Sequence, residues 1–210
     1  RRNDIYAVAL KYNIMIVEDD PYGMIRYDDL RIKPIKYLDA DERVVYLGSF
    51  SKTVSPGLRT GWMAAQKEII RRCTIAKQGE DTCSNTLSQF IIHDFIHSGS
   101  IYSQIAKVRM IYRLKRDIMT EAIERFIPSA FYRTPDGGLF IWLRCHEKIN
   151  TGDMHKKGLE RNVAYVPGNA FYPNGGGSNE MRLNFSFPSV ENIVEGIKRL
   201  GEIVDEELNK

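Results

Sequence analysis

VVYLGSFSKTVSPGLRTGWMAA, residues 44–65, carries the pattern that decides the fold of this chain. Residues 44–47 have the length and composition of a buried strand, and the strand runs into a polar turn at residues 48–52. A second strand-like run, residues 61–65, follows shortly after Arg59. In open α/β sheets, ligands bind beyond the carboxyl ends of the strands. The polar turn is therefore a candidate binding segment.

The residues on both sides of this stretch alternate between helix and strand patterns, as expected of an α/β fold. Residues 4–12 have helical spacing, and the apolar run 14–17 predicts another buried strand that ends in the polar turn 18–22. Helices are predicted downstream over residues 66–79, 85–98 and 101–127. Three strands make a small sheet for a doubly wound domain, which suggests that further strands precede residue 1.

Pro128 ends the long helix, and the pattern beyond it changes to short strands flanked by helices. Strands are predicted over residues 131–133, 139–143, 163–166 and 181–187, and helices over residues 153–161 and 189–208. This pattern predicts a small α+β unit. We therefore divide the chain within the long helix, into residues 1–105 of a larger domain and residues 106–210 of a small C-terminal domain. The run NGGGSN, residues 174–179, predicts a flexible loop.

The composition excludes several classes of protein. Hydrophobic residues make up 43% of the chain and charged residues 27%, which is the usual balance of a globular protein. The net charge of +3 gives no sign of a basic face for nucleic acid. No apolar run is long enough for a membrane span, and we expect no secretory signal. The 3 cysteines are scattered, so we predict no disulfides and a reducing, cytoplasmic setting. His93 and His97 lack a third ligand, so we predict no metal site.

Polar side chains at the ends of the first two predicted strands have the chemistry of a cofactor site. The candidates are Asp19, Tyr22, Ser49, Ser51, Lys52 and Arg59. Hydroxyls and a guanidinium suit a phosphate dianion, and a lysine beside them can lose its proton and act as an amine nucleophile. An aspartate can keep a ring nitrogen protonated, so the set suits pyridoxal phosphate. Taken singly, Lys52 reads as a surface lysine and Asp19 as a turn residue.

Four segments, in this order, resemble the fold-type I pyridoxal-phosphate aminotransferases, and most closely the subgroup of kynurenine and 2-aminoadipate aminotransferases. They are VEDDPYG (17–23), YLGSFSKTVSPGLRTGW (46–62), TPDGGLFIWL (134–143) and MRLNFSF (181–187). The resemblance covers essentially the whole chain. It implies an α/β fold: the C-terminal part of a large domain with a mixed, mainly parallel sheet, followed by an α+β small domain.

The resemblance implies a role for each candidate near the cofactor ring. Lys52 matches the Schiff-base lysine, which holds the cofactor and then moves a proton at the substrate Cα. Asp19 matches the partner of the pyridinium nitrogen, which makes the ring an electron sink. Tyr22 matches the tyrosine that hydrogen-bonds the phenolic oxygen of the ring.

The remaining candidates match anion-binding residues of the family. Ser49, Ser51 and Arg59 match the residues that anchor the cofactor phosphate. Arg182 matches the arginine that pairs bidentately with the substrate α-carboxylate. Without the family, Arg182 could be a solvated residue of an alternating strand.

The resemblance also implies partners and limits. It implies an α-amino acid and a 2-oxo acid as substrates, and a homodimer in which residues 78–89 approach the neighbouring cofactor. Alternatively, residues 78–89 only connect two helices and contact no neighbouring subunit. The family motifs expected before residue 1 are not in this sequence. We therefore expect the chain to match the C-terminal half of a subunit and to be inactive by itself.

Two other functions remain open on the same motifs. Aminotransferase-like effector domains occur in winged-helix transcriptional regulators, which keep a lysine at the position of Lys52. A lyase or decarboxylase on the same fold is a further alternative. We favour the aminotransferase because VEDDPYG and MRLNFSF are closer to the enzymes.

Overall fold

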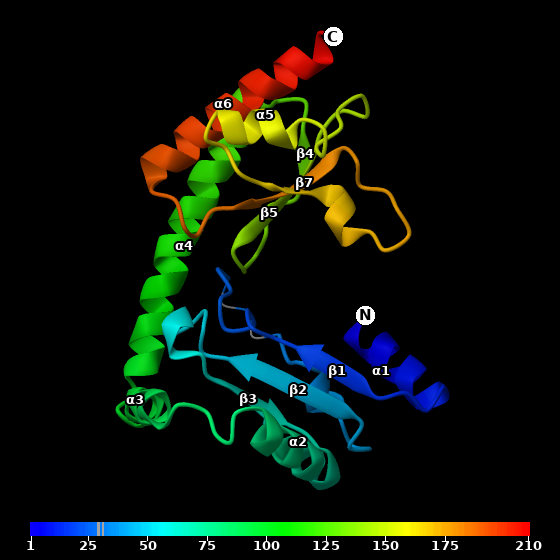
Figure 1. Cartoon of the computed structure of the whole chain (residues 1–210), viewed down its shortest axis with the longest axis vertical. Helices are drawn as coiled ribbons and strands as arrows, with labels where there is room; N and C mark the ends of the chain where they lie inside the picture. The colour runs from blue at the N-terminus through cyan, green and yellow to red at the C-terminus, as the bar shows by residue number, and fades with distance from the viewer. Residues whose placement is uncertain (29, 31) are drawn as a thin grey trace. The chain divides into compact units, whose positions relative to one another are not determined.

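A computed structural model describes residues 1–28, 30 and 32–210 of the chain. The chain forms two compact units, Arg1–Arg109 and Met110–Lys210, and the division falls within the long helix α4, Ser100–Phe126 (Figure 1). The domain boundary predicted between residues 105 and 106 stays a prediction, because a boundary between domains is tested by whether each part folds alone.

The first unit combines helices with a mixed sheet, which confirms the predicted α/β class. Its described strands form a three-stranded sheet in the order β1-β2-β3, with β1 and β2 parallel and β2 and β3 antiparallel. The arrows of β1 and β2 point the same way in Figure 1. In chain order its elements are α1 (Arg2–Lys11), β1 (Ile16–Asp19), η1 (Ile35–Leu38), β2 (Val44–Ser49), η2 (Pro56–Leu58), β3 (Gly61–Ala64), α2 (Lys67–Glu80), α3 (Thr86–His97) and the start of α4.

Strand β1 lies two residues later than the sequence predicts, and it is not buried on both faces. Ile14 donates its N–H to the carbonyl of Ala9 at the end of α1, 2.9 Å away, so the strand begins only at Ile16. Val17 is 65% exposed, whereas Glu18 is half-buried. The Glu18 carboxylate accepts the backbone N–H groups that begin η1, at 2.8 and 2.9 Å. These bonds satisfy a charge that would otherwise be costly to bury.

The second unit is the predicted α+β arrangement. Its described strands form a four-stranded sheet in the order β4-β5-β7-β6, and every pair is antiparallel. Because antiparallel strands alternate their side chains between two faces, one face can be packed and the other left open. Its elements after α4 are β4 (Phe131–Tyr132), β5 (Phe140–Arg144), α5 (His155–Glu160), β6 (Val166–Pro167), η3 (Gly168–Phe171), β7 (Glu180–Asn184) and α6 (Val190–Leu208).

The packed face of this sheet lies against helices. Ile141 and Leu143 of β5 are fully buried, as is Met181 of β7. Leu183 shares a cavity with Met119 of α4 and with residues of α6, so this face is the one that the two helices cover. Arg182 alternates with those residues and therefore belongs to the opposite face.

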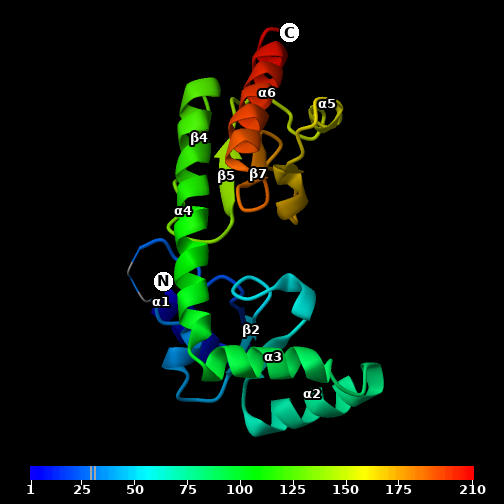
Figure 2. The ribbon, with the colours of Figure 1, turned by 90° about the vertical axis from the view of Figure 1, so that its left-hand side faces the viewer.

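Figure 2 shows α6 beside the second half of α4. Their close contact occurs at Gly201, where an added Cβ would lie 2.3 Å from the Phe126 carbonyl oxygen. Within the described part of the chain, no helix is long and apolar enough to cross a membrane.

Candidate active site

The end of β2 and its connection to β3 carry four of the seven candidate residues. Its ends are joined by the Phe50 N–H, which donates to the Thr60 carbonyl at 3.2 Å. Inside it, the Val54 N–H donates to the Phe50 carbonyl at 2.8 Å, which closes one tight turn around Lys52. The four candidates on this segment, in chain order, are Ser49, Ser51, Lys52 and Arg59. Their proximity follows from local backbone bonds alone, which is why sequence spacing could predict it.

The parallel pairing places Asp19 next to the same segment. Asp19 is in register with Leu47, and Ser49 is two residues further along β2. Because side chains two residues apart share a face, Asp19 and Ser49 belong to one face of the sheet at the carboxyl ends of the two strands. The Asp19 side chain is exposed, so it is open to a ligand on that face.

The turn after β1 is fixed by two residues that the sequence analysis did not single out. The Tyr46 hydroxyl donates to the Asp20 carboxylate at 2.7 Å, and the Asp20 N–H donates to the Leu47 carbonyl at 3.0 Å. Gly23 leaves room for that carboxylate, since a Cβ there would lie 2.2 Å from Asp20 Oδ2. Burial and the bond to Asp20 raise the pKa of Tyr46. Its hydroxyl therefore keeps its proton and donates a hydrogen bond to the Asp20 carboxylate. These contacts hold the turn that carries Tyr22.

The cationic side chains of the connection are not neutralised by the protein. In the described part of the chain, Lys52 makes no side-chain hydrogen bond or ion pair, and Arg59 donates only to the Pro56 carbonyl, at 3.4 Å. Arg59 also has a left-handed backbone, with φ of 48°. A non-glycine residue in that region is uncommon and often marks a functional site. Ser49 Oγ accepts the Ser51 N–H at 3.1 Å, which fixes the first turn of the segment.

Arg182 lies in the second unit, on the face of the sheet that the helices leave open. Its guanidinium carbon is 4.2 Å from the centre of the Phe140 ring and 4.8 Å from that of the Phe171 ring. Its Nε is buried and has no hydrogen-bond partner. Among the described residues no carboxylate pairs with it, so its charge is available to an acidic ligand.

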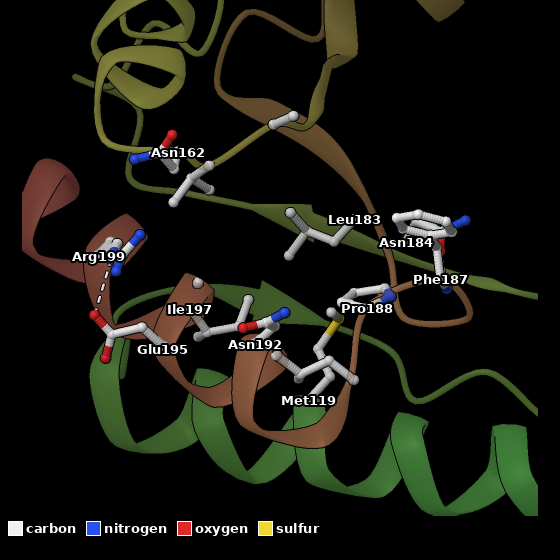
Figure 3. A pocket seen from close by; sticks show the side chains of 14 residues that line it. Met119, Asn162, Leu183, Asn184, Phe187, Pro188, Asn192, Glu195, Ile197 and Arg199 are labelled. Carbon is white, nitrogen blue, oxygen red and sulfur yellow. Dashed lines mark hydrogen bonds and ion pairs between the residues drawn. The ribbon is translucent and has the colours of Figure 1, made fainter.

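Two cavities of the structure lie away from these residues. One, of about 480 Å³, opens between α6 and the loops beside it, and Leu183, Ile197 and Met119 form its apolar side (Figure 3). Glu195 and Arg199 form an ion pair at its edge. The other, of about 450 Å³, lies between β3 and α2. None of the seven candidate residues lines either cavity.

The other segments noted in the sequence have local roles in this chain. Asp81 pairs with Lys77 at the end of α2, and Asn85 caps α3 by accepting the Ser88 N–H at 2.9 Å. The rings of His93 and His97 stack with centres 5.7 Å apart. Among the described residues, no group of three or more potential ligands is placed to hold a metal ion around them or elsewhere.

Comparison with known families matches the sequence model "Aminotransferase class I and II" over residues 2–200. The chain belongs to this family. The aromatic-amino-acid aminotransferase 1 of Thermococcus litoralis is 44% identical over 211 residues, which cover 100% of this chain and 51% of the relative. The crystal structure of the Pyrococcus horikoshii kynurenine aminotransferase superposes with a TM-score of 0.94 at 42% identity, over 99% of this chain and 52% of that chain. These likenesses confirm the predicted family, subgroup and fold class.

The regulators considered as an alternative also match, but less closely. The HTH-type transcriptional regulator YdfD of Bacillus subtilis is 32% identical over 98% of this chain and 42% of the regulator. The Thermococcus litoralis aminotransferase is more similar, at 44% identity, so the regulator reading is not favoured. The chain spans about half the length of the relatives that it matches.

The donor set of this chain fits the cofactor of its family, pyridoxal 5′-phosphate. The kynurenine aminotransferase structure contains PMP, the amine form of that cofactor. Here, one short segment carries an unpaired lysine, an arginine and two serines, and an exposed carboxylate shares its sheet face. An amine, a phosphate-binding set and an acid for the ring nitrogen are the groups that this cofactor requires.

Proposed function

We propose that the protein containing this chain is a pyridoxal-phosphate-dependent aminotransferase, which moves an amino group from an α-amino acid to a 2-oxo acid. The observation that supports it best is the connection between β2 and β3. Ser49 ends β2 and three further candidates lie on that connection. Among the described residues, the lysine has no side-chain partner. Asp19 belongs to the same sheet face, at the carboxyl ends of the parallel pair.

Each residue of the first unit then has a defined task. Ser49, Ser51 and Arg59 bind the cofactor phosphate, and the permanent charge of Arg59 balances the dianion. When bound, the cofactor supplies the carbonyl that accepts an amine and the electron-poor ring that stabilises negative charge at the substrate Cα. Lys52 holds the cofactor through its amine and later moves the proton at the substrate Cα.

Asp19 and Tyr22 orient the ring in this proposal. The Asp19 carboxylate keeps the ring nitrogen protonated, and the Tyr22 hydroxyl donates to the phenolic oxygen. Both belong to the stretch that the bond between Tyr46 and Asp20 ties to β2. Their positions therefore depend on the same sheet that carries Lys52.

Arg182 selects the substrate class. Its planar guanidinium can bind both oxygens of a carboxylate, and no described carboxylate of the chain competes for it. We therefore propose α-amino acids and 2-oxo acids as the two substrates. Aromatic, branched-chain or 2-aminoadipate-like donors, with 2-oxoglutarate as acceptor, follow by analogy with the subgroup.

We also propose a homodimer and a cytoplasmic location, as is usual for the family. The chain spans only about half of its relatives, and Asp19 and Arg59 are exposed in it. An active site of this kind must exclude water to work well. We therefore expect the 210-residue chain to turn over little substrate by itself.

The test is to trap the cofactor on the complete gene product. The protein is incubated with pyridoxal phosphate, reduced with borohydride and digested, and the modified peptide is found by mass spectrometry. We expect one stoichiometric adduct at Lys52. Production of a 2-oxo acid from an α-amino acid, measured on an unreduced portion of the protein, separates transamination from decarboxylation, which would release carbon dioxide instead.

Two variants serve as controls. Lys52→Ala should lose both the adduct and the activity. Lys67→Ala removes an exposed lysine at the start of α2, and it should leave labelling at Lys52 intact. Weak labelling scattered over many lysines of the complete protein would refute the proposed function.

A further inference from the structure

Arg182 is held by two aromatic rings that differ in how they are themselves fixed. Phe140 lies on β5, where it is in register with Asn184 of β7. The pairing of β5 with β7 therefore places Phe140 diagonally across from Arg182 on the same face of the sheet. Phe171 instead lies outside the paired strands, at the end of the short helix η3 and eleven residues before Arg182. Strand β6, which pairs with β7 at Arg182, leads directly into η3, and the loop after η3 returns the chain to β7.

That loop is tightly folded, although its glycine run predicted flexibility. A Cβ on Gly168 would lie 2.5 Å from the Gly177 carbonyl oxygen, so the two ends of the loop touch. Gly177 has a φ of 68°, and a Cβ there would lie 2.5 Å from the Tyr172 ring. The Tyr172 hydroxyl donates to the Glu180 carboxylate at 2.6 Å. The glycines thus let the backbone wrap around Tyr172, which is itself tied to β7.

The neighbouring ring adds a further constraint on Phe171. Trp142, opposite Arg182 on β5, packs edge-to-face with Phe171 at 5.1 Å between ring centres and an interplanar angle of 84°. Edge-to-face contacts of this kind favour one ring orientation. Phe171 remains 42% exposed, so these two contacts fix one side of the ring and leave the other open.

We propose that Phe171 is a positioning residue, which the Gly168–Gly177 loop holds against Arg182 so that the guanidinium meets the substrate carboxylate in one fixed plane. This inference rests on the proposed function of Arg182. A bidentate pair needs a defined plane, and a preorganised side chain loses less entropy when the ligand binds. A ring contact also stabilises a guanidinium that has no anionic partner among the described residues.

The test compares kinetic constants of the complete gene product and its Phe171→Leu variant. Leucine keeps an apolar side chain but removes the ring. We expect the KM for the α-amino acid to rise about five- to tenfold, the equivalent of one lost cation–π contact, with kcat little changed. Such a split indicates lost ground-state binding of the substrate. Phe171→Tyr, which restores a ring, should return KM close to the original value.

The chain offers a matched control on the same sheet. The Arg144 guanidinium carbon lies 4.8 Å from the Phe131 ring centre, the same separation as between Arg182 and Phe171. Phe131→Leu removes this ring and should leave KM unchanged. Tyr172→Phe cuts the bond to Glu180 without changing Phe171, and it should raise KM in the same direction.

The outcomes separate this inference from the proposed function. Labelling of Lys52 by pyridoxal phosphate should persist in every variant, because the residues that hold the cofactor are unchanged. A wild-type protein without that label refutes the function. A labelled protein in which Phe171→Leu leaves KM unchanged, or in which Phe171→Tyr fails to restore it, overturns only the positioning role.

Discussion

Asp39 is a carboxylate whose side chain is fully buried in the first unit. It accepts hydrogen bonds from Lys36 Nζ at 2.7 Å, from the Arg43 N–H at 2.8 Å and from the Val44 N–H at 3.0 Å. Burial by itself would raise its pKa, but these donors outweigh burial and hold the pKa below its usual value. The ionised form therefore fastens the end of η1 to the start of β2.

Replacing Asp39 by asparagine should destabilise the protein by about 2 kcal/mol at pH 7, because a buried bonding site is left unsatisfied. The folded pKa is below the unfolded one, so the contribution is complete above the unfolded pKa near 4 and is lost as pH falls through the folded pKa. Urea unfolding of both proteins between pH 7 and pH 3 measures this. The gap between their midpoints should shrink toward acid pH.

Asp41→Asn is the matched control, since its exposed side chain accepts only the Tyr6 hydroxyl, at 2.9 Å, and asparagine can accept it too. It should change stability by less than about 0.5 kcal/mol. Equal midpoints for Asp39→Asn and the wild type at pH 7 would show that the carboxylate is not a fastening point.

At this scale the sequence predicted what local spacing determines. Ser49, Lys52 and Arg59 could be assigned to one short stretch because the bonds that fold it are short-range. The environment of Glu18 could not be predicted, because its partners in η1 lie 17 and 18 residues away. The contact between Arg182 and the Phe171 ring could not be predicted either. The glycine run after Phe171 predicts only a flexible loop.

Among the elements, α6 shows how a single glycine sets a helix-packing distance. A Cβ at Gly201 would lie 2.3 Å from the Phe126 carbonyl oxygen of α4 and 3.2 Å from its Cβ. Backbone cannot move aside as a flexible side chain can. Gly201→Ala should therefore force the helices apart and cost about 2 kcal/mol or more, as overpacking of a core does.

Gly196→Ala, one and a half turns earlier in α6, is its control because nothing lies within 4 Å of the added Cβ. That substitution should stabilise the protein by about 0.5–1 kcal/mol, since alanine favours helix over glycine. Chemical denaturation of the two variants measures both changes in the free energy of unfolding, a decrease for Gly201→Ala and an increase for Gly196→Ala. A stabilised Gly201→Ala protein would disprove the close approach of α6 and α4.

The long helices were predicted to within a residue or two because their apolar spacing persists over many turns. The predicted helices 101–127 and 189–208 correspond to α4 and α6. The short helices η1 and η2 were not predicted. Each depends on a capping contact, from Glu18 in one case and from the Ser55 hydroxyl in the other, and such contacts leave no periodic signal.

Over the whole molecule, the core is divided unequally between the two units. Among the described residues, the largest fully buried side chains belong to the second unit, apart from Ile25 and Val44. The first unit has a small buried cluster of Tyr6, Ile35 and Val44. Its sheet leaves large apolar side chains exposed, among them Val17 at 65%, Trp62 at 46% and Met63 at 36%.

Residues 106–210, expressed alone, should therefore fold in one cooperative transition, whereas residues 1–105 alone should not. A continuous apolar core with an antiparallel sheet and two packed helices is enough for a domain of this size. The buried residues that form it, from Met119 on α4 to Val204 on α6, all lie inside the predicted boundary. Circular dichroism during urea unfolding, with the dispersion of amide NMR signals, provides the measurement. A collapsed, non-cooperative 106–210 fragment would place the boundary elsewhere and would mean that Arg182 and its rings need the first unit to form. A cooperative one would mean that Arg182 is positioned by the small domain alone.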